Sequence, residues 1–187
     1  MQQTMDLLSS LLGMFTRKPK TIRFLRFKDS SGNFEILYPE GWKYDHDIAV
    51  LDAKYTNSFE SPDCNCRFTI AFDGGLASDF NFAKYAKKEL EGPSAGIIAD
   101  AVKGKFRGMD CFRREYVYAS GGRKYFGGGV MFYTGNAVYS VSWNAPESEK
   151  QVMKAVFDHM LDSLVVWETE KKKMMREIDA ASAIKET

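Results

Sequence analysis

Residues 64–72 alternate between apolar and more polar side chains more regularly than any other stretch of the chain. The apolar positions are Cys64, Cys66, Phe68, Ile70 and Phe72, with Asn65, Arg67, Thr69 and Ala71 between them. Successive side chains of a β-strand point to opposite faces of its sheet, so this period of two predicts a strand with one buried face. The fold must therefore contain a sheet that other elements cover.

Turn signals divide much of the remaining chain into further strands. Residues 21–28 and 34–38 flank a polar turn at 29–33, which predicts a hairpin. Residues 42–59 predict another strand, broken around 45–47. Residues 97–143 predict an antiparallel run, because glycines fall near the breaks and the segments between them are rich in tyrosine and phenylalanine.

Two segments have the apolar spacing of amphipathic helices. The first follows a cap at Ser78 or Asp79, buries Phe82, Tyr85, Ala86 and Leu90, and stops at Gly92-Pro93. The second opens at Pro146 and carries an apolar stripe of Met153, Val156, Phe157, Met160, Leu161 and Leu164. Helices bury such stripes against sheets, so the predicted fold class is α+β: a mostly antiparallel sheet sandwiched by helices.

Both ends of the chain differ from this core, which is predicted as a single domain over residues 21–167. The spacing of Leu7, Leu8, Leu11, Leu12 and Phe15 predicts an N-terminal amphipathic helix, followed by a basic linker to residue 20. This helix suits an anionic membrane surface, a homodimer contact or the domain's own sheet. Residues 168–187 predict a charged helical tail. The candidate binding residues at the N-terminal end are Leu8, Leu12, Phe15, Arg17, Lys18 and Lys20.

The charge is unevenly distributed. The formal net charge of the chain is +1, yet residues 1–28 carry six basic side chains against one acidic side chain, Asp6. A nucleic-acid-binding domain is usually more basic overall, so nucleic acid is a disfavoured partner. Three cysteines, two of them one residue apart, do not suit a disulfide framework. The apolar stretch 5–15 lacks a preceding basic region, unlike a secretory signal, so a cytoplasmic protein is expected.

No set of residues predicts catalysis, a metal or a cofactor. Cys64 and Cys66 would start a thiolate site, but only Cys111, His46 and His159 remain as soft ligands. Small buried core residues are the favoured interpretation of the cysteines. His46 lies in Asp-His-Asp, interpreted as a hydrated turn, and His159 is interpreted as a partly buried helix residue.

Two other motifs have a structural and a functional interpretation. Gly127-Gly128-Gly129 is followed by strand-like residues and not by a helix, so a bulge or a close helix contact is favoured over a phosphate loop. Arg113, Arg114 and Arg123-Lys124 flank aromatic strands, a pattern also seen on RNA-binding sheets, although a solvated face is the simpler interpretation. Arg113 and Arg114 are kept as candidate binding residues.

Two stretches resemble the Mog1/PsbP-like superfamily. Phe34-Glu-Ile-Leu-Tyr-Pro-Glu-Gly-Trp42 is similar to its opening hairpin. Gly135-Asn-Ala-Val-Tyr-Ser-Val-Ser-Trp143-Asn-Ala-Pro146, followed by Met160-Leu-Asp-Ser-Leu164, is similar to its closing strand and helix. The resemblance covers about residues 33–166. It implies an α/β/α sandwich, to which the N-terminal helix and the C-terminal tail would be additions.

Members of this superfamily include a Ran-binding import factor, extrinsic photosystem II proteins, bacterial lipoproteins and secretion chaperones, which share no reaction. The resemblance therefore implies a non-enzymatic module that binds a protein partner as an adaptor or assembly factor. The alternative is a membrane-surface or small-molecule binding protein that works through the N-terminal helix. The lipobox cysteine of the lipoproteins is absent.

Overall fold

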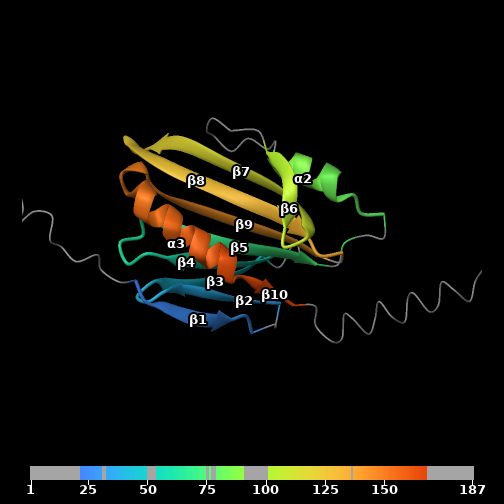
Figure 1. Ribbon diagram of the computed structural model, residues 1–187, viewed down its shortest axis with the longest axis horizontal. Coiled ribbons are helices and arrows are strands. Elements are labelled where there is room, and N and C mark those ends of the chain that lie inside the picture. Colours follow the sequence, from blue (N-terminus) through green and yellow to red (C-terminus); the bar gives the residue numbers. More distant parts are fainter. Residues whose placement is uncertain are drawn as a thin grey trace, which may run out of the picture.

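The computed structural model describes residues 22–30, 33–49, 54–74, 76, 79–90, 101–135 and 137–167. These residues form two sheets (Figure 1). The small sheet has the order β1-β2-β10 and contains β1 (Phe24–Lys28), β2 (Phe34–Pro39) and β10 (Val165–Val166). The large sheet has the order β3-β4-β5-β9-β8-β7-β6. Its strands are β3 (Lys43–Ala49), β4 (Lys54–Glu60), β5 (Arg67–Gly74), β6 (Val102–Phe106), β7 (Met109–Ser120), β8 (Arg123–Tyr133) and β9 (Ala137–Pro146).

All paired strands of both sheets run antiparallel. The predicted α+β class with a mostly antiparallel sheet is therefore confirmed. The predicted alternation is confirmed from Cys66 onward, since Cys66, Phe68, Ile70 and Phe72 are all buried. Cys64 does not follow it. It is exposed, has a φ of 58° and lies in the turn before β5.

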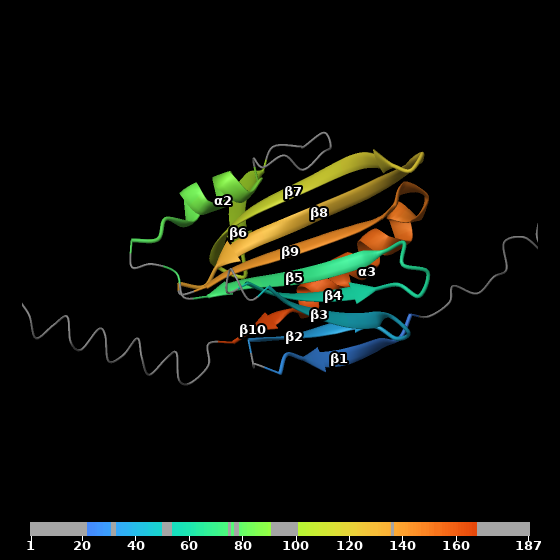
Figure 2. The same ribbon diagram turned by 180° about the vertical axis from the view of Figure 1, so that it is seen from behind.

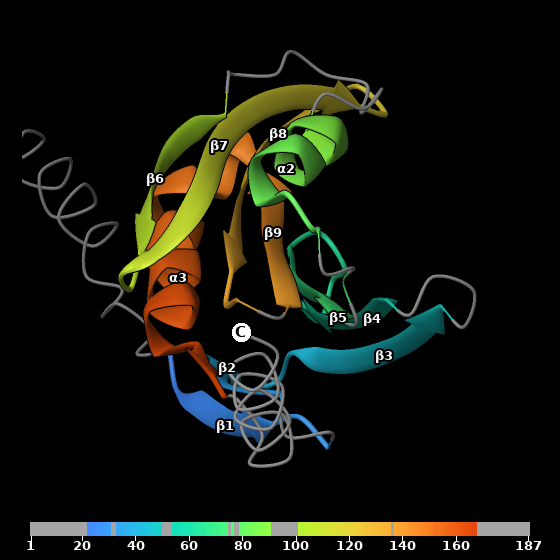
Figure 3. The same ribbon diagram turned by 90° about the vertical axis from the view of Figure 1, so that its right-hand side faces the viewer.

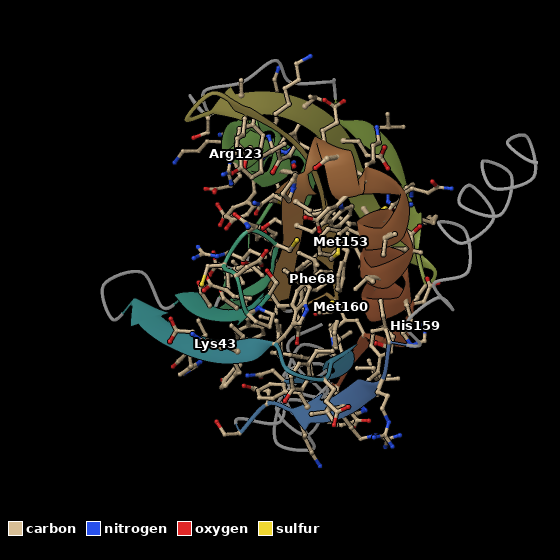
Figure 4. All side chains as sticks on the ribbon, turned by 90° about the vertical axis from the view of Figure 1, so that its left-hand side faces the viewer. Lys43, Phe68, Arg123, Met153, His159 and Met160 are labelled. Atoms are coloured by element: carbon tan, nitrogen blue, oxygen red, sulfur yellow. The ribbon has the colours of Figure 1, made fainter. Side chains whose placement is uncertain are left out.

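Helix α3 (Lys150–Ser163) lies across one face of the large sheet, after a 3-10 turn at Glu147–Glu149 (Figure 1). The predicted stripe is confirmed, because all six of its residues are buried. The Phe157 ring lies 6.1 Å from that of Phe68 and 6.4 Å from that of Trp143. Phe68, Met153 and Met160 fill the interior between β5 and α3 (Figure 4). This layer is the main hydrophobic core.

The small sheet packs on the same side of the large sheet as α3. The amide of Leu37 on β2 donates a 2.9 Å hydrogen bond to Oγ of Ser163, the last residue of α3. Phe27 of β1 packs its ring edge-on against Phe59 of β4, with 5.3 Å between the ring centroids. Residues from both ends of the domain therefore close one side of the core.

Helix α2 (Phe82–Leu90) covers one end of the opposite face (Figure 2). Its Ala86 is fully buried against Met131 of β8 and Val138 of β9. The predicted cap at Ser78 or Asp79 is wrong for this helix, because Oδ1 of Asn81 accepts a 2.9 Å hydrogen bond from the Lys84 amide. The large sheet thus has a helix on each face.

One other local prediction is also corrected. Residues 42–59 form two paired strands, β3 and β4, in place of one broken strand, and residues 45–47 lie within β3.

The predicted N-terminal helix and the C-terminal tail lie outside the described residues. The candidate binding residues there are Leu8, Leu12, Phe15, Arg17, Lys18 and Lys20. In the described part of the chain, no helix has the length and apolar character to cross a membrane.

Candidate functional site

The face of the large sheet opposite α3 is covered only at one end, because α2 is the single described helix on that side (Figure 2). A row of residues in direct register crosses the rest of this face: Ser58, Thr69, Ser142, Gly129 and Arg114. Four of the five have short side chains or none, so they form a shallow floor. This row and the three neighbouring tyrosines, Tyr116, Tyr118 and Tyr125, form a surface that we call the open face.

Three tyrosines stand beside this floor. Tyr116 and Tyr118 lie two residues apart on β7 and therefore share a face, and Tyr125 of β8 is paired directly with Tyr118. The rings of Tyr118 and Tyr125 are stacked with centroids 5.3 Å apart, and those of Tyr116 and Tyr118 are 5.9 Å apart. All three side chains are half-buried. We call Tyr116, Tyr118 and Tyr125 the tyrosine row.

The glycine triplet makes room for aromatic rings on both faces of β8. A Cβ at Gly127 would lie 2.7 Å from Cε2 of Tyr116, on the open face. A Cβ at Gly128 would lie 2.6 Å from Cζ2 of Trp143, on the face that α3 covers. The prediction of a bulge or a close helix contact is therefore wrong: all three glycines pair in regular register within β8, and rings occupy the space. The continuation of this segment as a strand is confirmed.

Tyr116 and Tyr118 of the tyrosine row offer neutral hydroxyl groups. Burial is the main cause that raises the pKa of Tyr116, and the nearby Arg114 only partly offsets it. Burial also raises the pKa of Tyr118, and Tyr116 and Tyr125 act in the same direction. These phenols therefore stay protonated at neutral pH and can donate and accept hydrogen bonds.

The two adjacent arginines lie on opposite faces of the sheet. Arg114 belongs to the open face, with its guanidinium carbon 5.4 Å from the centroid of the Tyr116 ring. Arg113 lines a hollow on the other face, together with Cys111. The side chains of these two predicted binding residues thus leave opposite faces of β7, although both residues belong to the lining of the hollow. Arg123, at the start of β8 and two residues before Tyr125, is exposed (Figure 4).

The cysteines and histidines do not converge. Cys66 and Cys111 are buried, as predicted for core residues, whereas Cys64 is exposed. Burial, helped by Glu149, raises the pKa of the Cys66 thiol to about 11, so it is a poor nucleophile at neutral pH. Among the described residues, no three His, Cys, Asp or Glu side chains gather in a group that could hold a metal ion.

Both histidine interpretations need correction. His46 lies within β3 and not in a turn, and its Nδ1 is 3.0 Å from Oδ1 of the buried Asn57. His159 is exposed on the outer side of α3, where its ring packs 4.3 Å from that of Phe24 (Figure 4). The two histidines lie on different elements, β3 and α3.

Comparison with solved structures identifies the fold. The chain matches the solution structure of cyanobacterial PsbP (CyanoP) from Synechocystis sp. PCC 6803 with a TM-score of 0.58 and 14% identity, over 83% of this chain and 100% of that one. The chain has the Mog1/PsbP-like fold. The fold implied by the two sequence stretches is thus confirmed.

Two further structures with the Mog1/PsbP-like fold are similar. PA94 of Pseudomonas aeruginosa, a protein of unknown function, matches with a TM-score of 0.50 and 15% identity, over 79% of this chain and 99% of that one. LpqN of Mycobacterium tuberculosis, described as involved in cell envelope biogenesis, matches with a TM-score of 0.50 and 9% identity, over 80% of this chain and 93% of that one. No family model and no curated protein sequence matches the chain.

Proposed function

We propose that this protein is a non-enzymatic module that binds a protein partner through its open face, as an adaptor or assembly factor. The observation that carries the proposal is the tyrosine row beside a floor of short side chains. Tyrosine supplies a large, rigid contact area with a polar tip, and it is enriched at the centres of protein interfaces. A shallow floor suits a partner surface better than a small molecule, which needs a concave site.

The charges around the tyrosine row indicate the character of the partner. Arg114 and Arg123 flank the row and add positive charge at its two ends. The acidic side chains at the far edge of this face are partly neutralised, since Glu60 forms an ion pair with Arg67. An acidic segment with apolar or aromatic side chains between its carboxylates would complement this surface.

Site-specific photo-crosslinking in the native cell tests the proposal. A benzophenone amino acid replaces Tyr118 in one variant and Tyr55 in a matched control, because Tyr55 is an exposed tyrosine on β4 outside the open face. We expect position 118 to capture one defined protein, with little or no capture at position 55. The charge-reversed double variant R114E/R123E should abolish that adduct.

Three results would contradict the proposal. One is equal capture at both positions, and another is an adduct that survives reversal of both arginines. The third is an adduct of this chain with a second copy of itself, which would make the open face a homodimer surface. Pelleting with anionic vesicles, compared between the whole chain and one lacking residues 1–16, separately tests membrane binding by the N-terminal residues.

A further inference from the structure

The face of the large sheet that carries α3 has a hollow of about 400 Å³ near the β6 edge. Its apolar lining includes Gly104, Phe106, Cys111 and Val130, from strands β6, β7 and β8. Its charged members are Lys103 and Lys105 of β6 and Arg113, Arg114 and Glu115 of β7. Arg113 and Glu115 follow Cys111 on the same face of β7. Ligand pockets of this kind are mostly apolar and have a few polar groups that orient the ligand. Phe106, Cys111 and Val130 belong to the core on the α3 side of the sheet, opposite the tyrosine row.

Small side chains in neighbouring strands explain why the hollow exists. Gly104 is paired directly with Cys111, and a Cβ at position 104 would meet nothing closer than the Cys111 sulfur at 3.8 Å. Helix α3 lies beside this region (Figure 3). Contacts from β7 and from the turn before it reach the helix: Glu115 lies 4.0 Å from Nζ of Lys154, and the Arg107 guanidinium donates to the carbonyl oxygen of Asp162.

The charges of the lining do not cancel, because four of its residues are basic (Lys103, Lys105, Arg113 and Arg114) and one, Glu115, is acidic. Glu115 faces Lys154, and Lys105 forms a 2.9 Å ion pair with Asp110. Arg113 forms no ion pair or hydrogen bond with any residue in the described part of the chain. An exposed guanidinium therefore stands at an apolar hollow with its bidentate donor edge unused. Carboxylates are the anions whose two oxygens match that edge.

We propose that this hollow binds a small carboxylate with an apolar body, with the carboxylate on Arg113 and the body against Phe106, Cys111 and Val130. A neutral analogue would keep the apolar contacts and lose the charge-assisted hydrogen bonds. A cationic analogue would meet Arg113 with like charge. Arg114 belongs to both the hollow and the open face, but Arg113, Phe106, Cys111 and Val130 belong to the hollow alone, so either proposal can fail without the other.

Titration followed by amide chemical shifts tests this site on the full chain. The probes are 4-phenylbutanoate, the matched alcohol 4-phenylbutan-1-ol and the matched amine. We expect saturable binding of the carboxylate, with shifts centred on β6 and the first half of β7. The alcohol should bind at least about tenfold more weakly and the amine should not bind.

Three variants separate the contributions to binding. R113Q should reduce carboxylate affinity to that of the alcohol, whereas R26Q, at an exposed arginine on β1 of the small sheet, should leave it unaltered. G104L should fill the hollow and abolish binding of both probes, and its thermal unfolding curve reports whether it folds. The proposal is overturned if the wild type shows no saturable binding, if R113Q binds like the wild type, or if the shifts map to the open face.

Discussion

The Tyr139 hydroxyl donates a 3.0 Å hydrogen bond to the carbonyl oxygen of Asn33. Tyr139 lies on β9 in the middle of the large sheet, and Asn33 precedes β2 of the small sheet. The same oxygen accepts a 3.0 Å hydrogen bond from the Trp167 amide, after β10. Burial raises the pKa of Tyr139, so the phenol remains a neutral donor at physiological pH. One carbonyl oxygen thus connects the large sheet with two segments of the small sheet.

Removing this hydroxyl should destabilise the junction of the two sheets. We expect Y139F to lower the free energy of unfolding by about 1 kcal/mol, because the Asn33 oxygen keeps its second donor. Urea unfolding followed by tryptophan fluorescence measures the change. Y125F, at a half-buried tyrosine of the open face, is the control and should have a smaller effect. Equal loss in the two variants would contradict a specific role for the Tyr139 bond.

The close approach of Trp143 to Gly128 predicts a strong effect of a single methyl group. A Cβ at position 128 would lie 2.6 Å and 2.8 Å from two atoms of the indole ring, and the ring is buried in the core. We expect G128A to destabilise the fold by about 1–3 kcal/mol through overpacking. G104A is the matched control in the same sheet, because its new methyl group would have only an ordinary contact. Thermal unfolding of both variants measures the difference, and an unchanged midpoint for G128A would contradict this packing.

The three thiols should differ in reactivity. Cys64 is exposed, whereas Cys66 and Cys111 are buried and burial raises the pKa of both thiols. At about pH 8 a thiol-specific reagent should therefore modify Cys64 quickly in the folded protein, and Cys66 and Cys111 slowly. C64S should remove the fast phase, and unfolding in denaturant should make the remaining thiols react rapidly. Fast modification in folded C64S would show that a buried cysteine is more accessible than the structure indicates.

Asp63 organises the turn before β5, and its titration should report that role. Its carboxylate accepts a 2.5 Å hydrogen bond from the Ser61 hydroxyl and a 2.8 Å bond from the Asn65 side chain. These bonds, with that of Ser61 largest, lower the pKa of Asp63. The lowered value means that the turn is stabilised above the ordinary aspartate pKa and loses that stabilisation as the pH falls through the folded-state value. Carboxyl chemical shifts should show a midpoint below the usual aspartate range, and S61A should raise it. An unchanged midpoint in S61A would refute the assigned cause.

Much of the fold could be predicted from local patterns. The alternation from Cys66 to Phe72 and the stripe from Met153 to Leu164 identified one buried strand face and one covering helix, because burial imposes periods of two and 3.6 on the side chains. The predicted ends of these elements were wrong where short-range hydrogen bonds compete with the periodic pattern. Asn81 is the cap in place of Asp79. The hydrogen bonds around Asp63 form a turn that includes Cys64, so the alternation begins only at Cys66.

The candidate sites depended on information that no local pattern contains. The sequence alone determined that Tyr116 and Tyr118 share a strand face and that Arg113 and Arg114 do not, since neighbouring residues of a strand point in opposite directions. Only the tertiary structure decided which face α3 covers, and so which of the two arginines lies on the side of α3 and which packs on the tyrosine row. Strand order and register place residues far apart in the chain, such as Ser58 and Arg114, in one row across the sheet. The packing of the whole domain determines that order and register.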